Sequence, residues 1–459
     1  MKNNRLRIYF INIMRAIGTL SLVIFLSSCA TLPKGQSQVD AMLLAQQYPQ
    51  AITLFQDNPN LYGKKNELLY LLDKGFAEHL NKNYKASIET FAKAQEQFDQ
   101  LYTESVGKIA ATWVINDYAA PYHGEDFEHV FINIFQALNY LMLGEYADAL
   151  VEARDVDSKL NAINFQYSDD QKNVYKEDAF ARMLMGIIYE IEPISENIND
   201  AFISYAKADD IYQTDYAPNY GVYTPGILKE NILSTARFMG LIEYSKYRNK
   251  FKSSEFLTQK EKRAKAEVYL IQYNGFSRLK TEAAVTVPLF DGHIVKVAFP
   301  EYKKRPYSVA SSRLLAKDAK NNIFQSPSEL VQDIGAIAQK NLDRRKIRFI
   351  AKSALRATGR YLFEKKQEEN IKKSQGSVAA GWFGFLSNMY NLVVEQADLR
   401  CWQSLPDQIR IARLILDPGD YGFTLENFND TGSYLGEIKL EPKSLVAGQK
   451  IFLIVRTLQ

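Results

Sequence analysis

Cysteine is scarce in this chain, which has only Cys29 and Cys401 among 459 residues. A fold held together by several disulfides is therefore excluded. The His-Glu-x-x-His pattern of zinc enzymes, a Gly-rich phosphate loop and Cys-x-x-Cys are also missing. Ser-x-x-Lys occurs at Ser105 and at Ser204, but without the Lys-Thr-Gly triplet that accompanies it in penicillin-binding enzymes. We therefore expect that the protein is not an enzyme and has no metal site and no cofactor.

The apolar run near the start of the chain, at residues 16–26, is too short to span a membrane stably. It follows four basic residues and ends in Leu-Ser-Ser-Cys, so residues 1–28 have the layout of a secretory signal peptide. This ending resembles the lipobox of bacterial lipoproteins, which implies cleavage before Cys29 and acylation of that cysteine. The next residue, Ala30, is not Asp, which resembles signals released to the outer membrane. A retained transmembrane anchor is the alternative.

The predicted acylation has two consequences. The acyl chains would hold the mature protein on the outer membrane, facing the periplasm, with residues 29–40 as a tether. Cys401 would then be the only thiol left, so no disulfide could form within the chain. We expect Cys401 to be a buried thiol; an intermolecular bridge or a reactive role is the alternative.

The two halves of the mature chain carry opposite charge. Residues 29–259 have 20 basic and 32 acidic residues, a net charge of −12, whereas residues 260–459 have 32 and 21, a net charge of +11. Such asymmetry indicates two domains with different partners, or two faces that attract one another.

Three stretches, beginning near residues 67, 131 and 179, predict helical hairpins with small residues where two helices must touch. A small residue in the first helix precedes one in the second by 12 positions in two copies and by 15 in the third. This is the spacing of tetratricopeptide repeats, in which small residues let each helix pair stack on the next. A generic helical bundle is the alternative. The packing positions are Gly75, Tyr84, Ser87, Phe91, Ala94, Ala137, Tyr140, Gly144, Tyr146, Ala149, Ala153, Gly186, Ala201, Tyr205 and Ala208.

A tyrosine-rich segment follows the third hairpin and contains Tyr212, Tyr216, Tyr220 and Tyr223. In an exposed loop these rings could stack on sugars or anchor a peptide. The alternative is that they pack the end of the hairpin. A last helix at about residues 228–247 is expected to cap the array.

From about residue 264 the pattern changes to β-branched and aromatic runs. Asp291-Gly292 separates residues 284–290 from 293–299, which is a strong hairpin signal. A second hairpin is expected from residues 409–416 and 421–425, and two final strands from 435–440 and 451–458. The sequence thus predicts an α+β protein. A tetratricopeptide-like helical domain at residues 41–258 precedes a smaller β-rich domain at 264–459, a sheet of five to seven strands with a long helical insert at about 328–394.

The insert carries basic residues at every fourth position of its helix, including Arg344, Arg348, Lys352, Arg356 and Arg360. This row could bind an anionic lipid, lipopolysaccharide, peptidoglycan or an acidic partner, whereas nucleic acid is disfavoured by the export signal. The alternatives are a solvated face or docking on the acidic half. The apolar run at 378–394 is expected to pack beneath the sheet; a membrane or subunit contact is the alternative.

Two groups of residues resemble an uncharacterised family of proteobacterial lipoproteins with tetratricopeptide-type helices. The first group is Gly124, Phe127, Glu128, Asn139, Tyr140, Ala149, Glu152 and Arg154, and the second is Arg400, Trp402, Leu405, Pro406, Ile409, Ala412, Arg413, Pro418 and Gly419. The resemblance implies a helical-repeat domain followed by a smaller mixed domain, and it carries over no catalytic residue. Cys401 departs from the small polar residue expected there.

The predicted function is that of a scaffold or envelope assembly factor, whose acidic helices present a concave surface to another envelope protein. A structural subunit of an oligomeric envelope complex and a glycan-binding protein are the alternatives. The oligomeric state stays open.

Overall fold

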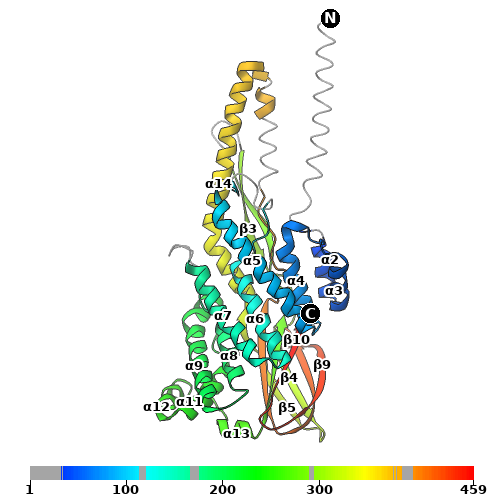
Figure 1. Cartoon of the computed structure of the whole chain (residues 1–459), viewed down its shortest axis with the longest axis vertical. Coiled ribbons are helices and arrows are strands. Elements are labelled where there is room, and N and C mark those ends of the chain that lie inside the picture. The colour runs from blue at the N-terminus through cyan, green and yellow to red at the C-terminus, as the bar shows by residue number, and fades with distance from the viewer. Residues whose placement is uncertain are drawn as a thin grey trace.

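The structure is a computed structural model that describes residues 33, 35–112, 120–165, 175–288, 294–375, 377–378, 380–384 and 396–458. Helices make up the N-terminal part and sheets the C-terminal part of this elongated molecule (Figure 1). The predicted α+β class is therefore confirmed. The signal peptide and Cys29 lie outside the described residues. Within the described part, no helix combines the length and the apolar character needed to cross a membrane.

The helices of the N-terminal part follow one another in antiparallel pairs, and each pair contacts the next. They are α2 (Gln36–Leu44), α3 (Tyr48–Asp57), α4 (Glu67–Leu80), α5 (Tyr84–Thr112), α6 (Asp126–Leu143), α7 (Tyr146–Phe165), α8 (Ala179–Tyr189), α9 (Ser195–Ile211), α10 (Ala217–Tyr220), α11 (Gly226–Met239), α12 (Leu241–Lys250) and α13 (Gln259–Arg263), with short turns η1 (Lys64–Asn66) and η3 (Tyr212–Tyr216). The three predicted hairpins are α4–α5, α6–α7 and α8–α9.

Small residues in these hairpins lie where two helices meet. A Cβ added to Gly75 would lie 2.8 Å from the ring of Phe91, and one added to Gly186 would lie 2.3 Å from the ring of Tyr205. Most predicted packing positions are buried, whereas Tyr84, Tyr140 and Tyr146 are half-buried. Gly144 acts differently, because it ends α6 with a φ of 79° and has open space around it.

The C-terminal part contains two four-stranded sheets and a separate hairpin. One sheet has the order β10-β1-β7-β6, the other β5-β4-β8-β9, and β2 pairs with β3. The strands are β1 (Ala266–Asn274), β2 (Leu279–Pro288), β3 (Ile294–Lys303), β4 (Ser311–Asp318), β5 (Ile323–Pro327), β6 (Glu329–Asp333), β7 (Gln408–Leu416), β8 (Gly419–Phe428), β9 (Tyr434–Leu445) and β10 (Lys450–Thr457).

Strand β1 is buried along its whole length and separates two cores. Its even-numbered side chains, such as Val268 and Leu270, pack against the other four-stranded sheet. Its odd-numbered side chains, such as Tyr269 and Tyr273, belong to the core of the helical half. Since side chains alternate between the faces of a strand, β1 joins the helices to the sheet sandwich.

One of the strand predictions is confirmed and two need correction. The β2–β3 hairpin is confirmed, but its turn lies outside the described residues. Strands β7 and β8 do not form the second hairpin, because β7 pairs with β1 and β6 while β8 pairs with β4 and β9. The predicted single sheet is divided, and within one of its parts β10 pairs in parallel with β1.

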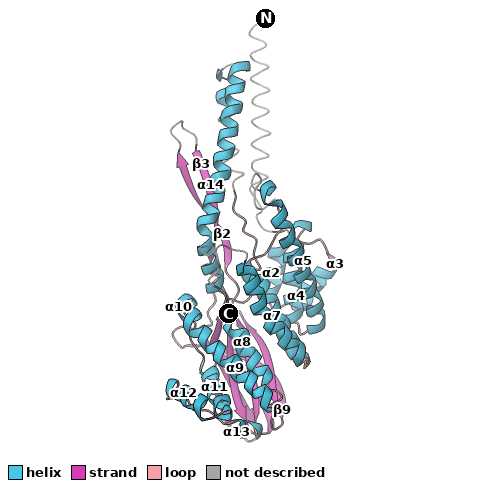
Figure 2. Cartoon of the chain, turned by 60° about the vertical axis from the view of Figure 1, so that its left-hand side comes forward, coloured by secondary structure: helices cyan, strands magenta, loops and turns pink. Residues whose placement is uncertain are grey.

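The long helix α14 (Ile334–Gln375) is the insert, and the six residues predicted as its first turns include strand β6. With 42 residues it is about 60 Å long. Its first half packs along β3, where Ser353 Oγ donates to the Ala298 carbonyl (2.8 Å) and Lys346 pairs with Glu301 (2.6 Å). Its second half extends beyond the hairpin β2–β3 (Figure 2).

Two further boundaries differ from the prediction. The tether cannot include residues 36–40, because they belong to α2, whose Gln36 and Val39 are buried. The expected capping helix at 228–247 is two helices, since Gly240 separates α11 from α12 with a φ of 146°.

The substitution Gly186→Ala tests the helix contact in the third hairpin. We expect it to destabilise the protein by about 1–3 kcal/mol, because the added methyl group must displace the buried ring of Tyr205. The matched control is Gly359→Ala in α14, which meets no neighbour and should be neutral or slightly stabilising. Urea denaturation followed by circular dichroism measures both. Equal stability of the two variants would contradict the close contact.

Candidate functional site

The acidic helical half and the basic sheet half dock on each other. Glu125, at the start of α6, pairs with Lys280 of β2 and with Arg345 of α14. Arg305 donates from both terminal nitrogens to Asp40 of α2, at 2.6 and 3.1 Å. The opposite charges found in the sequence therefore meet at an internal interface. Of the basic row on α14, Arg344 is exposed, and the side chains of Arg348, Lys352, Arg356 and Arg360 lie outside the described part.

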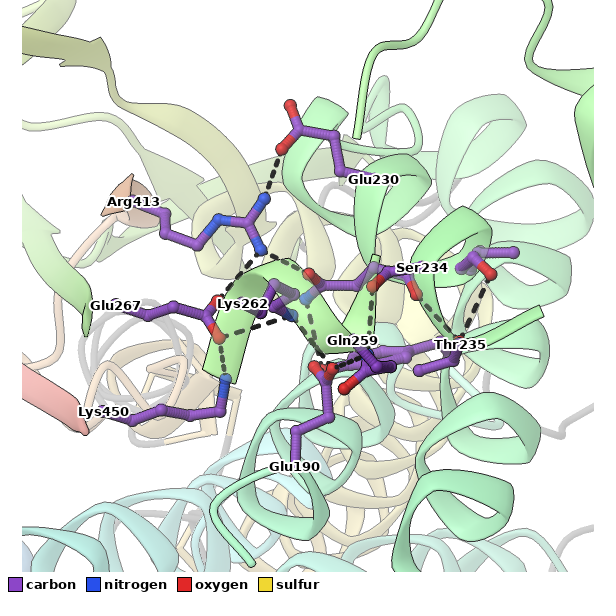
Figure 3. A network of polar contacts seen from close by, with 12 residues as sticks. Glu190, Glu230, Ser234, Thr235, Gln259, Lys262, Glu267, Arg413 and Lys450 are labelled. Carbon is purple, nitrogen blue, oxygen red and sulfur yellow. Dashed lines mark hydrogen bonds and ion pairs between the residues drawn. The ribbon is translucent and has the colours of Figure 1, made fainter. Parts of the chain in front are cut away.

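A buried ion network joins the third hairpin to the sheet (Figure 3). Glu267 of β1 forms ion pairs with Lys262 (3.3 Å), with Arg413 (3.3 Å) and with Lys450. Glu190, after α8, accepts from Lys262 at 2.9 Å. Burial alone would raise the pKa of Glu267, but the three surrounding cations hold it below its usual value. The network is thus a set of compensated charges, with every member serving as a partner for another.

A segment of the sheet half, residues 397–407, is inserted among α4, α5 and α6. Trp402 is fully buried against Phe76, Phe91 and Phe135, with ring centroids 5.9 to 6.1 Å apart. Its backbone N–H donates to Glu128 Oε1 (2.7 Å). The inner surface of the first two hairpins is therefore covered by the chain itself. The expected concave surface for another protein is not available at this place.

Polar contacts fix both ends of the inserted segment. Arg400 donates to the Asn66 side chain and to the Ala120 carbonyl, both at 3.0 Å, and pairs with Asp398. Ser404 Oγ donates to Asp73 Oδ1 at 2.5 Å. Burial raises the pKa of Asp73 to about 7 and that of Glu128 to about 7. Two carboxyl groups that hold this segment thus titrate near neutral pH.

Sequence reasoning missed these two carboxyl groups as a pair. Asp73 and Glu128 are 55 positions apart and each reads as an ordinary helix residue. Glu128 also completes a capping box with Glu125 at the start of α6. The available signal was that Glu128 and Trp402, which are in contact, both belong to the residues that carry the lipoprotein resemblance.

His79 lies in a buried chain of hydrogen bonds that has no contact with solvent. Its Nδ1 is 2.6 Å from Asn139 Oδ1, and its Nε2 is 2.8 Å from the Tyr273 hydroxyl. Asn139 donates to Ser87 Oγ, which in turn donates to the Gly75 carbonyl (2.7 Å). Burial lowers the pKa of His79 to about 4. The histidine is thus neutral at neutral pH and joins α4 and α6 to β1.

The other candidate residues in the described part make contacts within the fold. Ser204 donates to the Asp200 carbonyl, whereas Lys207 pairs with Glu177, so this Ser-x-x-Lys pair has no shared hydrogen bond. The side chains of Ser105 and Lys108 lie outside the described part. Among the described residues, no three His, Cys, Asp or Glu side chains are grouped as a metal site would need. Cys401 is buried as expected, and burial raises the pKa of its thiol to about 12.

The tyrosine-rich segment is helical and mostly buried. Tyr212, Tyr216 and Tyr220 stack edge to face at 5.3 and 5.2 Å, and the Tyr212 hydroxyl donates to the Val331 carbonyl (2.9 Å). Their spacing of four residues is a signal of one helix face that the sequence prediction did not use. These three rings are not available for stacking on a sugar, whereas Tyr223 is 73% exposed. The alternative interpretation, in which these tyrosines pack the end of the third hairpin, is therefore the one that fits them.

Comparisons with family models, with curated proteins and with solved structures found no match to this chain.

The substitution Glu267→Gln tests the ion network. It keeps the shape of the side chain but removes the negative charge that compensates the cations Lys262, Arg413 and Lys450. We expect a loss of about 3–5 kcal/mol of stability, since an uncompensated buried charge is costly. The double variant Glu267→Gln, Lys450→Met should recover part of this loss, and Glu437→Gln on the surface of β9 is the control. Denaturation midpoints measure all of them; no difference between the first variant and the control would contradict the network.

The substitution Asp73→Asn tests the carboxyl group that holds the inserted segment. A carboxyl group with a raised pKa stabilises the fold at low pH, and this contribution is lost as the pH rises through the folded value of about 7. The difference in unfolding free energy between parent and variant should therefore shrink from pH 5 to pH 7.5, by up to about 1.4 kcal/mol per pH unit. Asp57→Asn at the exposed end of α3 is the control. A difference that does not depend on pH would refute the assignment.

Proposed function

We propose that this protein is an acyl-anchored outer-membrane lipoprotein that faces the periplasm and acts as a scaffold or assembly factor, without chemistry of its own. Cys29 would carry the anchor, and the helix pairs would form a divergent tetratricopeptide-type array. The close contacts of Gly75 with Phe91 and of Gly186 with Tyr205 support the repeat interpretation. The use of histidines and buried carboxyl groups as structural contacts supports a binding role.

The partner of this scaffold would bind α14, and the exposure of the far half of this helix is the observation that carries the proposal. Leu362 is 59% exposed and Phe363 64% exposed. The short helical segment 380–384 folds back toward α14, because a Cβ on Gly384 would lie 3.1 Å from the Glu368 carboxylate. It adds Trp382, 48% exposed, to the same end, where Val378 is 76% exposed. This arm replaces the covered concave surface as the binding region.

The chemistry of the arm favours a protein partner with an apolar groove and an acidic rim. The projecting part of the arm exposes four large hydrophobic side chains, and exposed apolar surface is a mark of an interaction site. The lysines Lys365, Lys366, Lys372 and Lys373 lie between these residues in the sequence. A polysaccharide would not bury the aliphatic side chains of the arm. The expected packing of residues 378–394 beneath the sheet does not hold for Val378 and Trp382, and residues 385–395 lie outside the described part.

A structural subunit of an oligomer remains the second candidate, because the same apolar tip would suit a second copy of the chain. Self-association through the tip and binding of a different protein lead to different crosslinks. The two candidates are therefore separated by the same experiment.

Photo-crosslinking in intact cells tests the arm. We expect p-benzoylphenylalanine at position 362 to give a discrete crosslinked product, and the same group at Ile203, which is 55% exposed on α9, to give none. Adding Phe363→Glu should weaken the product at least tenfold, because a charge in an apolar contact must be desolvated. Coexpression of two differently tagged copies separates the candidates, since both tags in one product indicate an oligomer. Equal products from positions 362 and 203 would refute the arm as the binding region.

The anchor is tested separately by Cys29→Ser. The variant should lose acylation and appear in the soluble periplasmic fraction, since the acyl chains supply the membrane affinity. Unchanged membrane fractionation and processing would refute the lipoprotein proposal while leaving the arm untouched.

A further inference from the structure

Arg456 of β10 has a buried guanidinium group with few polar partners in the described structure. The residue is 5% exposed, and its Nη2 donates to the Gly275 carbonyl at 3.3 Å. Its Nε and Nη1 have no hydrogen-bond partner among the residues that the structure describes. The ion pairs among the described residues do not include Arg456, and the nearby Asp40 is held by both terminal nitrogens of Arg305. A buried charge without a counter-charge is costly, so this site is incomplete as it stands.

Aromatic rings hold the guanidinium in place but do not neutralise it. Its central carbon lies 4.1 Å from the ring centroid of Phe276 and 5.2 Å from that of Phe76. Arg305 lies over the same Phe276 ring, at 4.3 Å, and adds a second positive charge nearby. Burial lowers the pKa of Arg456 to about 10, and Arg305 acts in the same direction. The local charge therefore favours an added anion.

Arg456 is part of the wall of a pocket of about 350 Å³ between the helical half and the sheets. The volume is in the range of small-molecule sites. Gln46, Tyr48 and Asn427 supply polar groups to the wall. Leu80, Ile438, Ile454 and Leu458 supply an apolar side. A ligand that fits this wall has both a charged group and an apolar body.

The free edge of β10 also borders this pocket. The N–H groups of Glu267 and Gly275 donate to the carbonyls of Gln449 and Thr457, so the odd-numbered carbonyls of β10 face β1. Because backbone groups alternate along a strand, those of the even-numbered residues 454, 456 and 458 face away from β1. Strand β10 is the last strand of its sheet in the described structure. An open edge accepts an extended peptide by hydrogen bonding.

We propose that this pocket binds a carboxylate carried on an apolar chain, with the carboxylate paired to Arg456 and the chain against Leu80, Ile438 and Leu458. Two sources have this chemistry: the C-terminal residues of a peptide, which could also pair with the edge of β10, and a fatty acid. The edge favours the peptide. The site is independent of the α14 arm.

Isothermal titration of the full-length mature protein tests the proposal with three probes. They are acetyl-Leu-Val-Leu with a free carboxylate, the same peptide as its C-terminal amide, and octanoate. We expect the free acid to bind at least tenfold more tightly than the amide. Binding of octanoate in place of the peptide acid would identify a fatty acid as the source, with the same dependence on Arg456.

Two variants assign the binding to the pocket. Arg456→Met should weaken binding of the acid at least tenfold without lowering the thermal midpoint of the free protein, because it removes an uncompensated buried charge. Arg237→Met, at an exposed position of α11, is the matched control and should bind as the parent does. Three results would each overturn the proposal: equal binding of acid and amide, undiminished binding by the Arg456 variant, or no binding of either carboxylate at millimolar concentration.

Discussion

The burial of β1 on both faces is the constraint on which the rest of the structure depends. One face needs the second sheet and the other needs the helices, so neither half can bury its apolar surface without the other. The inserted segment around Trp402 extends this contact into the space among α4, α5 and α6. The helices are therefore one layer of a single folded unit and not an independent repeat domain whose inner surface is open.

The sequence predicted the features that depend on nearby residues. The spacing of small and aromatic residues predicted the packing positions of each hairpin, among which Gly186 and Tyr205 are in contact, and Asp291-Gly292 predicted the β2–β3 hairpin. Pairings between distant segments were not predictable. The turn Asp417-Pro418-Gly419-Asp420 does not reveal whether the strand after it pairs with the strand before it or joins another sheet. Here β8 joins a different sheet from β7. The tyrosines at four-residue intervals carried a helical signal that proline and glycine obscured.

The complementary charges contribute more to the specificity of the docking between the two halves than to its stability. Removing Glu125, Lys280 and Arg345 from water is expensive, and their attraction repays that cost only when all of them are paired. The same holds for Glu267 with its three cations. A shifted docking of the two halves would leave several of these charges buried without partners. Such a penalty would disfavour alternative registers between the helices and the sheet.

Polar groups that have partners inside the fold can be separated in this way from those that remain available for binding. His79, Asp73 and Glu128 each have partners within the described chain, and Cys401 is a buried thiol with a raised pKa, so their chemistry is used inside the fold. Arg456 differs, because two of its nitrogens are unpartnered beside a pocket. The far half of α14 differs in another way, since Leu362 and Phe363 are apolar and more than half exposed. Arg456 and the far half of α14 are therefore the two places where we propose that a ligand or partner completes contacts that the described chain leaves open.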